Sequence, residues 1–179
     1  LAVGLVGCGN TAAPTPTPAK KEFKVGLVTD VGGLNDKSFN FLANKGLDKA
    51  VKELGVTKGV VESKQMTDYE TNLSRFAQEK YNLVIAVGFL MYDAVEKVSK
   101  DYPDVKFMII DSSVTDRPNV ASAMFKTEQC GYLVGVLSGL MEKTPGIPNA
   151  LGKNTVGLVG GMAIPPVNDY IAGFIQGAK

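Results

Sequence analysis

Short apolar runs alternate with amphipathic stretches along the chain from residue 23 onward. Several of these runs are apolar at consecutive positions, as expected of strands that are covered on both faces. Such runs, separated by helical patterns, are typical of a parallel sheet wrapped by helices, so the sequence predicts an α/β fold. The predicted strands are 23–29, 59–63, 82–88, 105–111, 119–125 and 154–160.

The stretches between the first four runs carry apolar residues at helical spacing. The first of them predicts a helix that begins at Phe39 and is closed by Gly55. The second begins with a capping box from Thr67 to Glu70, and the third covers about 90–102 and stops before a proline. Helices therefore separate these predicted strands.

A further helix is predicted over 127–143, with the threonine at its start as the N-cap. Gly131, Gly135 and Gly139 recur at every fourth position and leave one face of this helix nearly bare. The apolar run is too short to span a bilayer, so we expect this face to pack closely against the sheet. Cys130 is expected to be a small buried side chain of the same helix.

The first eight residues, LAVGLVGC, are apolar or small up to Cys8. They are too few to span a bilayer, which takes about 20 residues, but they fit the end of a signal peptide. The last four resemble the bacterial lipobox, in which a lipid is attached to the cysteine sulfur and a small residue precedes the cleavage site. We therefore predict that residues 1–8 end a signal peptide and that Cys8 is lipidated. An ordinary first strand with a buried cysteine is the alternative.

The segment 9–22 has three prolines among threonines and alanines. It predicts an extended spacer that reaches on the order of 40 Å, and a lipid followed by such a spacer indicates a protein tethered to a membrane surface. The loop before residue 150 separates the first five strands from a new strand–helix unit. We therefore predict a ligand-binding lobe over 23–150 and the start of an incomplete second lobe over 151–179. There the chain ends inside a helical pattern without a capping residue, which predicts a fragment.

The chain has 179 residues, with 19 basic and 18 acidic side chains and a formal net charge of +1. Such a balanced charge does not indicate the excess of basic side chains that is typical of proteins that bind nucleic acid. Histidine is absent from the sequence, so the usual general base near neutral pH and the usual zinc ligand are missing. This argues against hydrolases and metalloenzymes. We predict no cofactor and no metal, and the two cysteines are not expected to pair.

Candidate functional residues follow the predicted strands, because ligands of open α/β sheets bind beyond the carboxyl ends of the strands. Aromatic faces stack on bases or sugars, and carboxylates accept hydrogen bonds from hydroxyl groups. The set therefore suits a flat, neutral, hydroxylated ligand better than phosphate, which prefers arginine and bare helix N-termini. Its members are Asp30, Asn35, Asp36, Ser38, Phe39 and Asn40 after the first strand, Gly88 and Phe89 after the third, Asp111, Ser112 and Ser113 after the fourth, and Gly160, Gly161 and Met162 after the sixth.

Structural interpretations of these residues stand beside the functional ones. Asp36 is expected to cap the helix that Phe39 begins, although Asp30 and Asp36 together would also serve as an acid and a base. The alternative interpretation of Phe39 is that its ring is buried in the hydrophobic core. The glycines at 156–161 lack the G-x-G-x-x-G spacing of a dinucleotide site, so they predict a close turn between strand and helix.

Four segments together resemble the basic membrane protein family of bacterial substrate-binding lipoproteins, and in particular its purine nucleoside receptors. They are TDVGGLNDKSFN, IIDSS, TEQCGYLVG and VGLVGGMAIPPVNDYIAGFIQGAK. The resemblance implies a type I periplasmic-binding-protein fold, in which two α/β lobes close on a ligand. It also implies a lipid-anchored protein that faces outside the cytoplasm at the cell membrane. Such a protein is not an enzyme and delivers its ligand to the permease and ATPase subunits of an ABC importer.

The same resemblance implies roles for six residues. The second lobe of the family supplies another stacking aromatic, an acidic residue and a lysine, and this chain ends before them, so we expect it to bind nucleosides weakly or not at all. A binding protein for a sugar or signalling molecule on the same fold is the alternative, and a flavodoxin-like enzyme is a third. The implied roles are stacking on the purine for Phe39, a hydrogen bond near it for Asn40, a contact to the base for Asp30, ribose hydroxyl binding for Asp111, and lining of the cleft for Gly88 and Phe89.

Overall fold

The computed structural model describes residues 22–148, 150 and 152–179. Cys8 and nearly all of the predicted spacer lie outside the described residues. A wholly parallel five-stranded sheet, in the order β2-β1-β3-β4-β5, confirms the predicted α/β fold. Its strands are β1 (Lys24–Thr29), β2 (Thr57–Glu62), β3 (Leu83–Val87), β4 (Lys106–Ile110) and β5 (Val120–Ala123).

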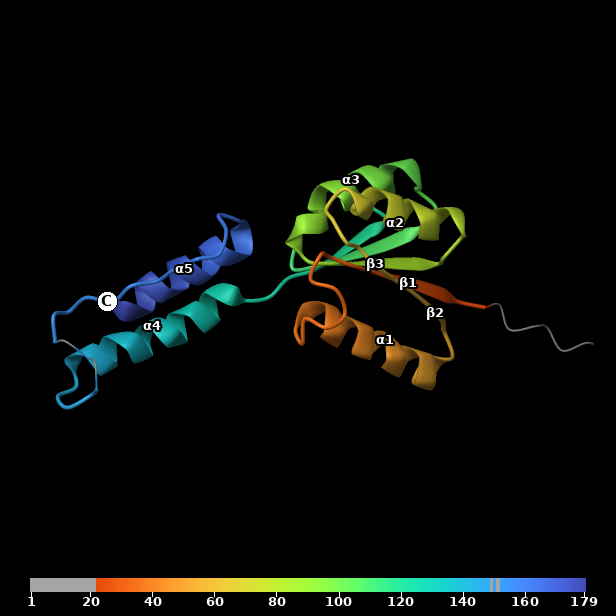
Figure 1. Ribbon diagram of the computed structural model, residues 1–179. Helices are drawn as coiled ribbons and strands as arrows, with labels where there is room; N and C mark the ends of the chain where they lie inside the picture. The colour runs from red at the N-terminus through yellow and green to blue at the C-terminus, as the bar shows by residue number, and fades with distance from the viewer. Residues whose placement is uncertain (1–21, 149, 151) are drawn as a thin grey trace, which may run out of the picture.

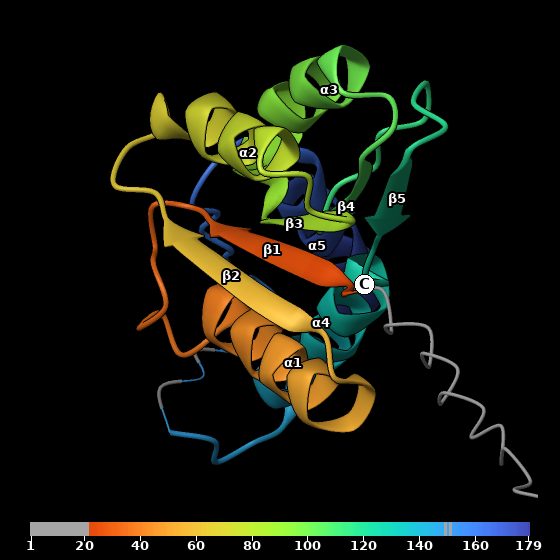
Figure 2. The ribbon, with the colours of Figure 1, turned by 90° about the vertical axis from the view of Figure 1, so that its right-hand side faces the viewer.

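Helices cover both faces of this sheet. Helix α1 (Phe39–Leu54) lies on one face, and α2 (Asp68–Gln78) and α3 (Tyr92–Asp101) lie on the other, with a short 3-10 turn, η1 (Phe89–Met91), before α3 (Figures 1 and 2). Each face has its own apolar core.

The central strand β1 shows why the apolar residues are consecutive. Leu27 is fully buried in the core on the α1 side, and its neighbour Val28 is fully buried in the core under α2 and α3. Successive side chains of a strand point to opposite faces, so a strand between two helical layers needs an apolar residue at every position.

The ends of the helices confirm one predicted cap and correct two others. Helix α1 ends at Gly55, which has a left-handed φ of 68° and donates its backbone N–H to the Val51 carbonyl at 3.0 Å. The capping box is wrong, because Thr67 has helical backbone angles and its hydroxyl makes no cap hydrogen bond. Asp68 accepts the free N–H groups of the preceding turn instead. The residue predicted as N-cap of the 127–143 helix is its first helical residue, and no side chain caps that end.

Two further helices, α4 (Thr127–Lys143) and α5 (Pro165–Ala178), form a hairpin beyond the carboxyl edge of the sheet (Figure 1). The extended segment 124–126 connects β5 to this hairpin. Since α4 packs mainly against α5 rather than against the sheet, the packing favours a lobe boundary near 124–126. The predicted boundary near 150 stays a prediction.

The glycine stripe of α4 faces α5 and not the sheet, which corrects the predicted packing partner. A Cβ atom on Gly131 would meet the Tyr170 carbonyl oxygen, and one on Gly135 would meet the Phe174 carbonyl oxygen. The stripe therefore serves close approach between two helix backbones. Cys130 is exposed, which contradicts the predicted burial, because it lies beside this stripe rather than within it.

The predicted strand 154–160 does not form. Residues 155–160 have no regular secondary structure, and Val159 is 99% exposed. A strand needs a neighbour that pairs its backbone N–H and C=O groups, and within the described part of the chain no strand lies beside this segment. None of the described helices is both long and apolar enough to cross a membrane.

Candidate functional site

Asp30 and Gly88 meet at the carboxyl ends of the neighbouring strands β1 and β3. The Oδ1 atom of Asp30 accepts hydrogen bonds from the Gly32 N–H at 2.8 Å and from Nδ2 of Asn40 at 2.7 Å. Its Oδ2 atom lies towards Gly88, 3.2 Å from the position that a Cβ there would take. Gly88 also has a φ of 100°, so both its backbone angle and this close approach favour glycine.

Asn40 lies behind Asp30 and is 1% exposed. Its Nδ2 group donates to Asp30 Oδ1 at 2.7 Å and to Asp36 Oδ2 at 3.1 Å, and its Oδ1 accepts the Asp30 N–H at 3.2 Å. The structure therefore brings Asn40 to the predicted site, with its amide already engaged by protein groups.

Asp36 acts as the cap of α1, as the structural interpretation predicts. Its carboxylate accepts the backbone N–H groups of Ser38 at 2.9 Å, Asn40 at 2.8 Å and Phe41 at 3.0 Å. Partial burial raises the pKa of Asp36, but these hydrogen bonds and the Asn40 amide outweigh it and hold the pKa below its usual value. This carboxylate is thus committed to the helix and is not free to act as an acid or base.

Phe39 begins α1 and is 42% exposed, so in this structure it is not a core residue. Its ring meets the ring of Phe125 edge to face, with 5.6 Å between the centroids and an angle of 82° between the planes. The residue thus remains partly exposed beside Phe125.

Asp111 follows β4 in an unusual backbone conformation. Its φ is 65°, in the left-handed region that non-glycine residues rarely adopt, and its N–H donates to the Ala123 carbonyl at 2.8 Å. Burial raises the pKa of the Asp111 carboxyl, and no hydrogen bond from a described residue offsets this effect. A half-buried carboxylate without a partner favours a ligand that donates hydrogen bonds.

Two cavities lie between the carboxyl edge of the sheet and the start of α5. One has a volume of about 370 Å³ and is lined by Phe39, Phe125 and Asp111 from the sheet side and by Gly160 and Gly161 from the other. The second, of about 330 Å³, shares Asp111 and adds Phe89. Phe39 and Phe89 thus line two different cavities that share Asp111, whereas Asp30, Asn40 and Gly88 line neither cavity.

Sequence reasoning missed several residues that line these two cavities, among them Met124, Phe125 and Tyr92. Met124 and Phe125 directly follow β5, but the sequence placed them inside the predicted strand 119–125, so the search beyond the strand ends passed over them. Tyr92 begins α3 and stacks on Phe89, with 6.3 Å between the ring centroids. The sequence gives no separate signal for Tyr92.

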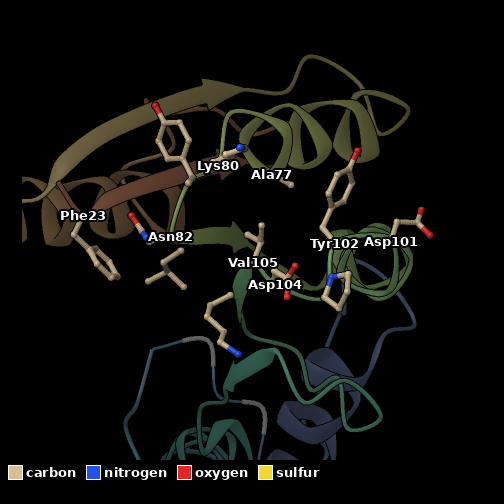
Figure 3. A pocket seen from close by; sticks show the side chains of 12 residues that line it. Phe23, Ala77, Lys80, Asn82, Asp101, Tyr102, Asp104 and Val105 are labelled. Atoms are coloured by element: carbon tan, nitrogen blue, oxygen red, sulfur yellow. The ribbon is translucent and has the colours of Figure 1, made fainter. Parts of the chain in front are cut away.

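A larger cavity, of about 790 Å³, lies at the opposite edge of the sheet, where the strands begin (Figure 3). Phe23, Tyr102 and Asp104 stand around it. Its polar groups are partly used by the fold, because Asn82 accepts the Lys24 N–H at 2.8 Å and the Tyr102 hydroxyl accepts from Gln78 at 2.9 Å. The two smaller cavities at the carboxyl edge are therefore the better candidates for a ligand site. No group of acidic or cysteine side chains among the described residues is arranged to hold a metal ion.

The parallel sheet with helices on both faces has the fold of the type I periplasmic-binding-protein class, to which its structural neighbours are similar. Comparison with known proteins places the chain more closely. It belongs to the Bmp family, ABC transporter substrate-binding protein PnrA-like, whose model matches residues 23–179. The resemblance to this family seen in the sequence is thereby confirmed, and the family is one of binding proteins rather than enzymes.

Individual relatives agree with this family. The chain is 34% identical to the ABC transporter nucleoside-binding protein BmpA of Lactococcus lactis, over 98% of the chain and 49% of the relative. It is 38% identical to an uncharacterized lipoprotein of Pyrococcus abyssi, over 100% of the chain and 43% of the relative. A solved ABC transporter solute-binding protein of Aeropyrum pernix matches with a TM-score of 0.76 and 33% identity, over 87% of the chain and 42% of that protein. The chain thus spans about half the length of the curated relatives it matches.

Proposed function

We propose that the full-length protein is the substrate-binding component of an ABC importer and that it binds purine nucleosides. The observation that carries the proposal is the shared cavity of Phe39 and Asp111, where a half-exposed aromatic ring and a partly buried carboxylate stand together. The name of the Lactococcus lactis relative, a nucleoside-binding protein, supports the choice of ligand.

In this proposal the six predicted residues divide the ligand between them. Phe39 stacks on the purine, because a base is flat and a half-exposed ring offers it a matching face. Asp111 accepts hydrogen bonds from the ribose hydroxyls, and Asp30 contacts the base with Oδ2. Gly88 and Phe89 line the cleft, and Asn40 lies next to the base contact.

The proposal is tested by isothermal titration of the full-length protein with inosine, guanosine, adenosine and ribose. We expect the nucleosides to bind and ribose alone to bind far more weakly, since ribose lacks the surface that Phe39 stacks on. Ribose binding without nucleoside binding would overturn the proposal in favour of a sugar receptor on the same fold. Turnover of a bound nucleoside would favour an enzyme.

The location of the protein belongs to the same proposal. Lipidation of Cys8 would anchor the protein outside the cytoplasm at the cell membrane, where the permease and ATPase subunits of an importer lie. Replacing Cys8 by serine should move the protein from the detergent phase to the aqueous phase of a membrane extraction. Continued partition into the detergent phase would contradict the lipobox.

A further inference from the structure

We propose that Asn40 is a positioning residue, which orients the Asp30 carboxylate towards the ligand without touching the ligand itself. This inference rests on the proposed nucleoside site. Asn40 is 1% exposed, and its amide is already engaged by Asp30 and Asp36 through both Nδ2 and Oδ1. Its effect on a ligand must therefore pass through its neighbours.

The Asn40 amide holds Asp30 at two points. The Nδ2 group donates to Asp30 Oδ1 at 2.7 Å, and the Oδ1 atom accepts the Asp30 backbone N–H at 3.2 Å. With Oδ1 of Asp30 fixed by Asn40 and by the Gly32 N–H, the second carboxylate oxygen is directed towards Gly88 and the edge of the sheet. Glycine at that position keeps the approach open.

Asn40 is itself fixed by the start of α1. Its Nδ2 group donates a second hydrogen bond to Asp36 at 3.1 Å, and Asp36 is held by three backbone N–H groups of that helix. The chain Asp36–Asn40–Asp30 thus transmits the position of α1 to the carboxylate. Phe39 is adjacent to Asn40 at the start of α1, so the same helix end positions both the Phe39 ring and, through Asn40, the Asp30 carboxylate.

A neutral amide with two donors suits this place, because it lies between two carboxylates. Asp30 and Asp36 bind the Asn40 amide directly, and two more titratable groups bind the preceding turn: Glu62 accepts the Leu34 N–H at 3.0 Å and Tyr69 accepts the Val31 N–H at 3.3 Å. No described lysine or arginine forms an ion pair with Asp30 or Asp36. An aspartate in place of Asn40 would add a third acidic group and remove the shared donor.

A double-mutant cycle in the full-length protein separates positioning from direct contact. With guanosine and inosine as probes, Asn40→Ala and Asp30→Ala should each weaken binding about 10- to 100-fold, since each removes a hydrogen bond that involves a charged group. In the Asp30→Ala background, Asn40→Ala should change the dissociation constant by less than about 2-fold. Additive losses would overturn the inference, because they would show that Asn40 contacts the ligand independently.

Two further variants keep the test decisive if Asn40→Ala folds poorly. Asn40→Asp should bind nucleosides weakly at pH 7.5. At about pH 5 part of the affinity should return, because a protonated carboxyl group can again donate a hydrogen bond to Asp30. A loss of affinity of equal size at both pH values would contradict positioning. Asn168→Asp, the same change at an exposed asparagine of α5 that lines neither cavity, is the matched control and should show no such pH-dependent recovery.

Hydrogen exchange in the present chain tests the positioning without any ligand. Asn40→Ala should accelerate exchange of the Gly32 N–H, which donates to Asp30 Oδ1, while the Gly88 N–H, which donates to the Ile110 carbonyl, should remain protected. Unchanged exchange at Gly32 would overturn the inference. Absence of nucleoside binding by the unsubstituted full-length protein contradicts the proposed function instead, so the two failures are distinguishable.

Discussion

At the scale of single residues, Asp111 combines two unfavourable features. Its positive φ of 65° strains the backbone, and its carboxylate is partly buried without a hydrogen-bond partner. A left-handed non-glycine residue costs about 1–3 kcal/mol, although aspartate and asparagine tolerate it best. Features of this kind gather at ligand sites, which supports the place of Asp111 in the proposed cleft.

Asp111→Asn should stabilise the fold near pH 7 while weakening nucleoside binding. Burial raises the pKa of Asp111 above its ordinary value of 3.8, so its contribution to stability is full below that value and is lost as the pH rises through the folded-state pKa. Asparagine keeps the backbone preference and removes the charge. The melting temperature of the variant should therefore exceed that of the parent chain at pH 7 and approach it near pH 3.

The exposed Asp116 provides the matched control, and Asp116→Asn should leave both melting temperatures nearly unchanged. A lower melting temperature of Asp111→Asn at pH 7 would show that the Asp111 carboxylate makes a stabilising contact in the fold.

Phe39→Ala should weaken nucleoside binding by about 1–3 kcal/mol, since stacking of a base on an aromatic ring contributes about that much. Isothermal titration of the full-length protein measures the loss. Phe41→Ala is the control, because Phe41 is equally exposed on α1 but lines neither cavity of the candidate site. Equal losses for the two variants would contradict a specific role for Phe39.

The sequence predicts single residues well where local chemistry decides their place. Asp36 lies two residues before the N-cap position, Ser38, and its carboxylate caps the helix as predicted. The contact between Phe39 and Phe125 could not be predicted in this way, because Phe125 is distant in the sequence and only the fold brings the two rings together. The hydrogen bonds of the Asn40 amide were likewise not predictable from the sequence, since they depend on how α1 is placed relative to the end of β1.

At the scale of elements, Asp36→Ala should destabilise the described lobe by about 0.5–2 kcal/mol, as expected for the loss of an N-terminal cap. The hydrogen bonds that lower the pKa of Asp36 outweigh the effect of its burial, so its stabilising contribution is present above the unfolded value of 3.8 and is lost as the pH falls through the folded-state pKa. Urea unfolding at pH 7 should therefore show the loss, and at pH 3 the difference should shrink.

Glu53→Ala is the control on the same helix, because Glu53 forms only an exposed ion pair with Lys49. Exposed pairs contribute about 0–1 kcal/mol, so this change should cost less than Asp36→Ala. A reversed order would contradict the capping role of Asp36.

Elements with strong internal patterns are predictable, and their partners are not. Consecutive apolar residues correctly placed all five strands of the sheet, and Gly55 correctly ended α1. The glycines of α4 correctly indicated a close approach to another backbone, but a bare helix face does not specify whether a sheet or a helix approaches it. For this reason the sequence assigned α4 to the wrong neighbour.

At the scale of the whole molecule, the segment 155–160 shows what a strand pattern cannot supply. Its apolar residues are those of a buried strand, yet Val159 is 99% exposed and no described strand pairs with it. The relatives are about twice as long as the chain, since the match covers 43–50% of them. We propose that the segment becomes a strand of the second lobe when that lobe's sheet is present.

The same difference in length leads to a prediction about affinity. One lobe offers a nucleoside the single stacking face of Phe39 and leaves the other face of the base in water. A second lobe that adds one stacking ring and one charged hydrogen bond would contribute about 2–3 kcal/mol or more, which corresponds to a factor on the order of 100 in the dissociation constant. The 179-residue chain should therefore bind guanosine at least that much more weakly than the full-length protein does. Titration of both proteins under one set of conditions measures the ratio, and Phe39→Ala in each shows whether the same site is used. Equal affinities would mean that one lobe suffices and that the ligand does not lie in a closing cleft.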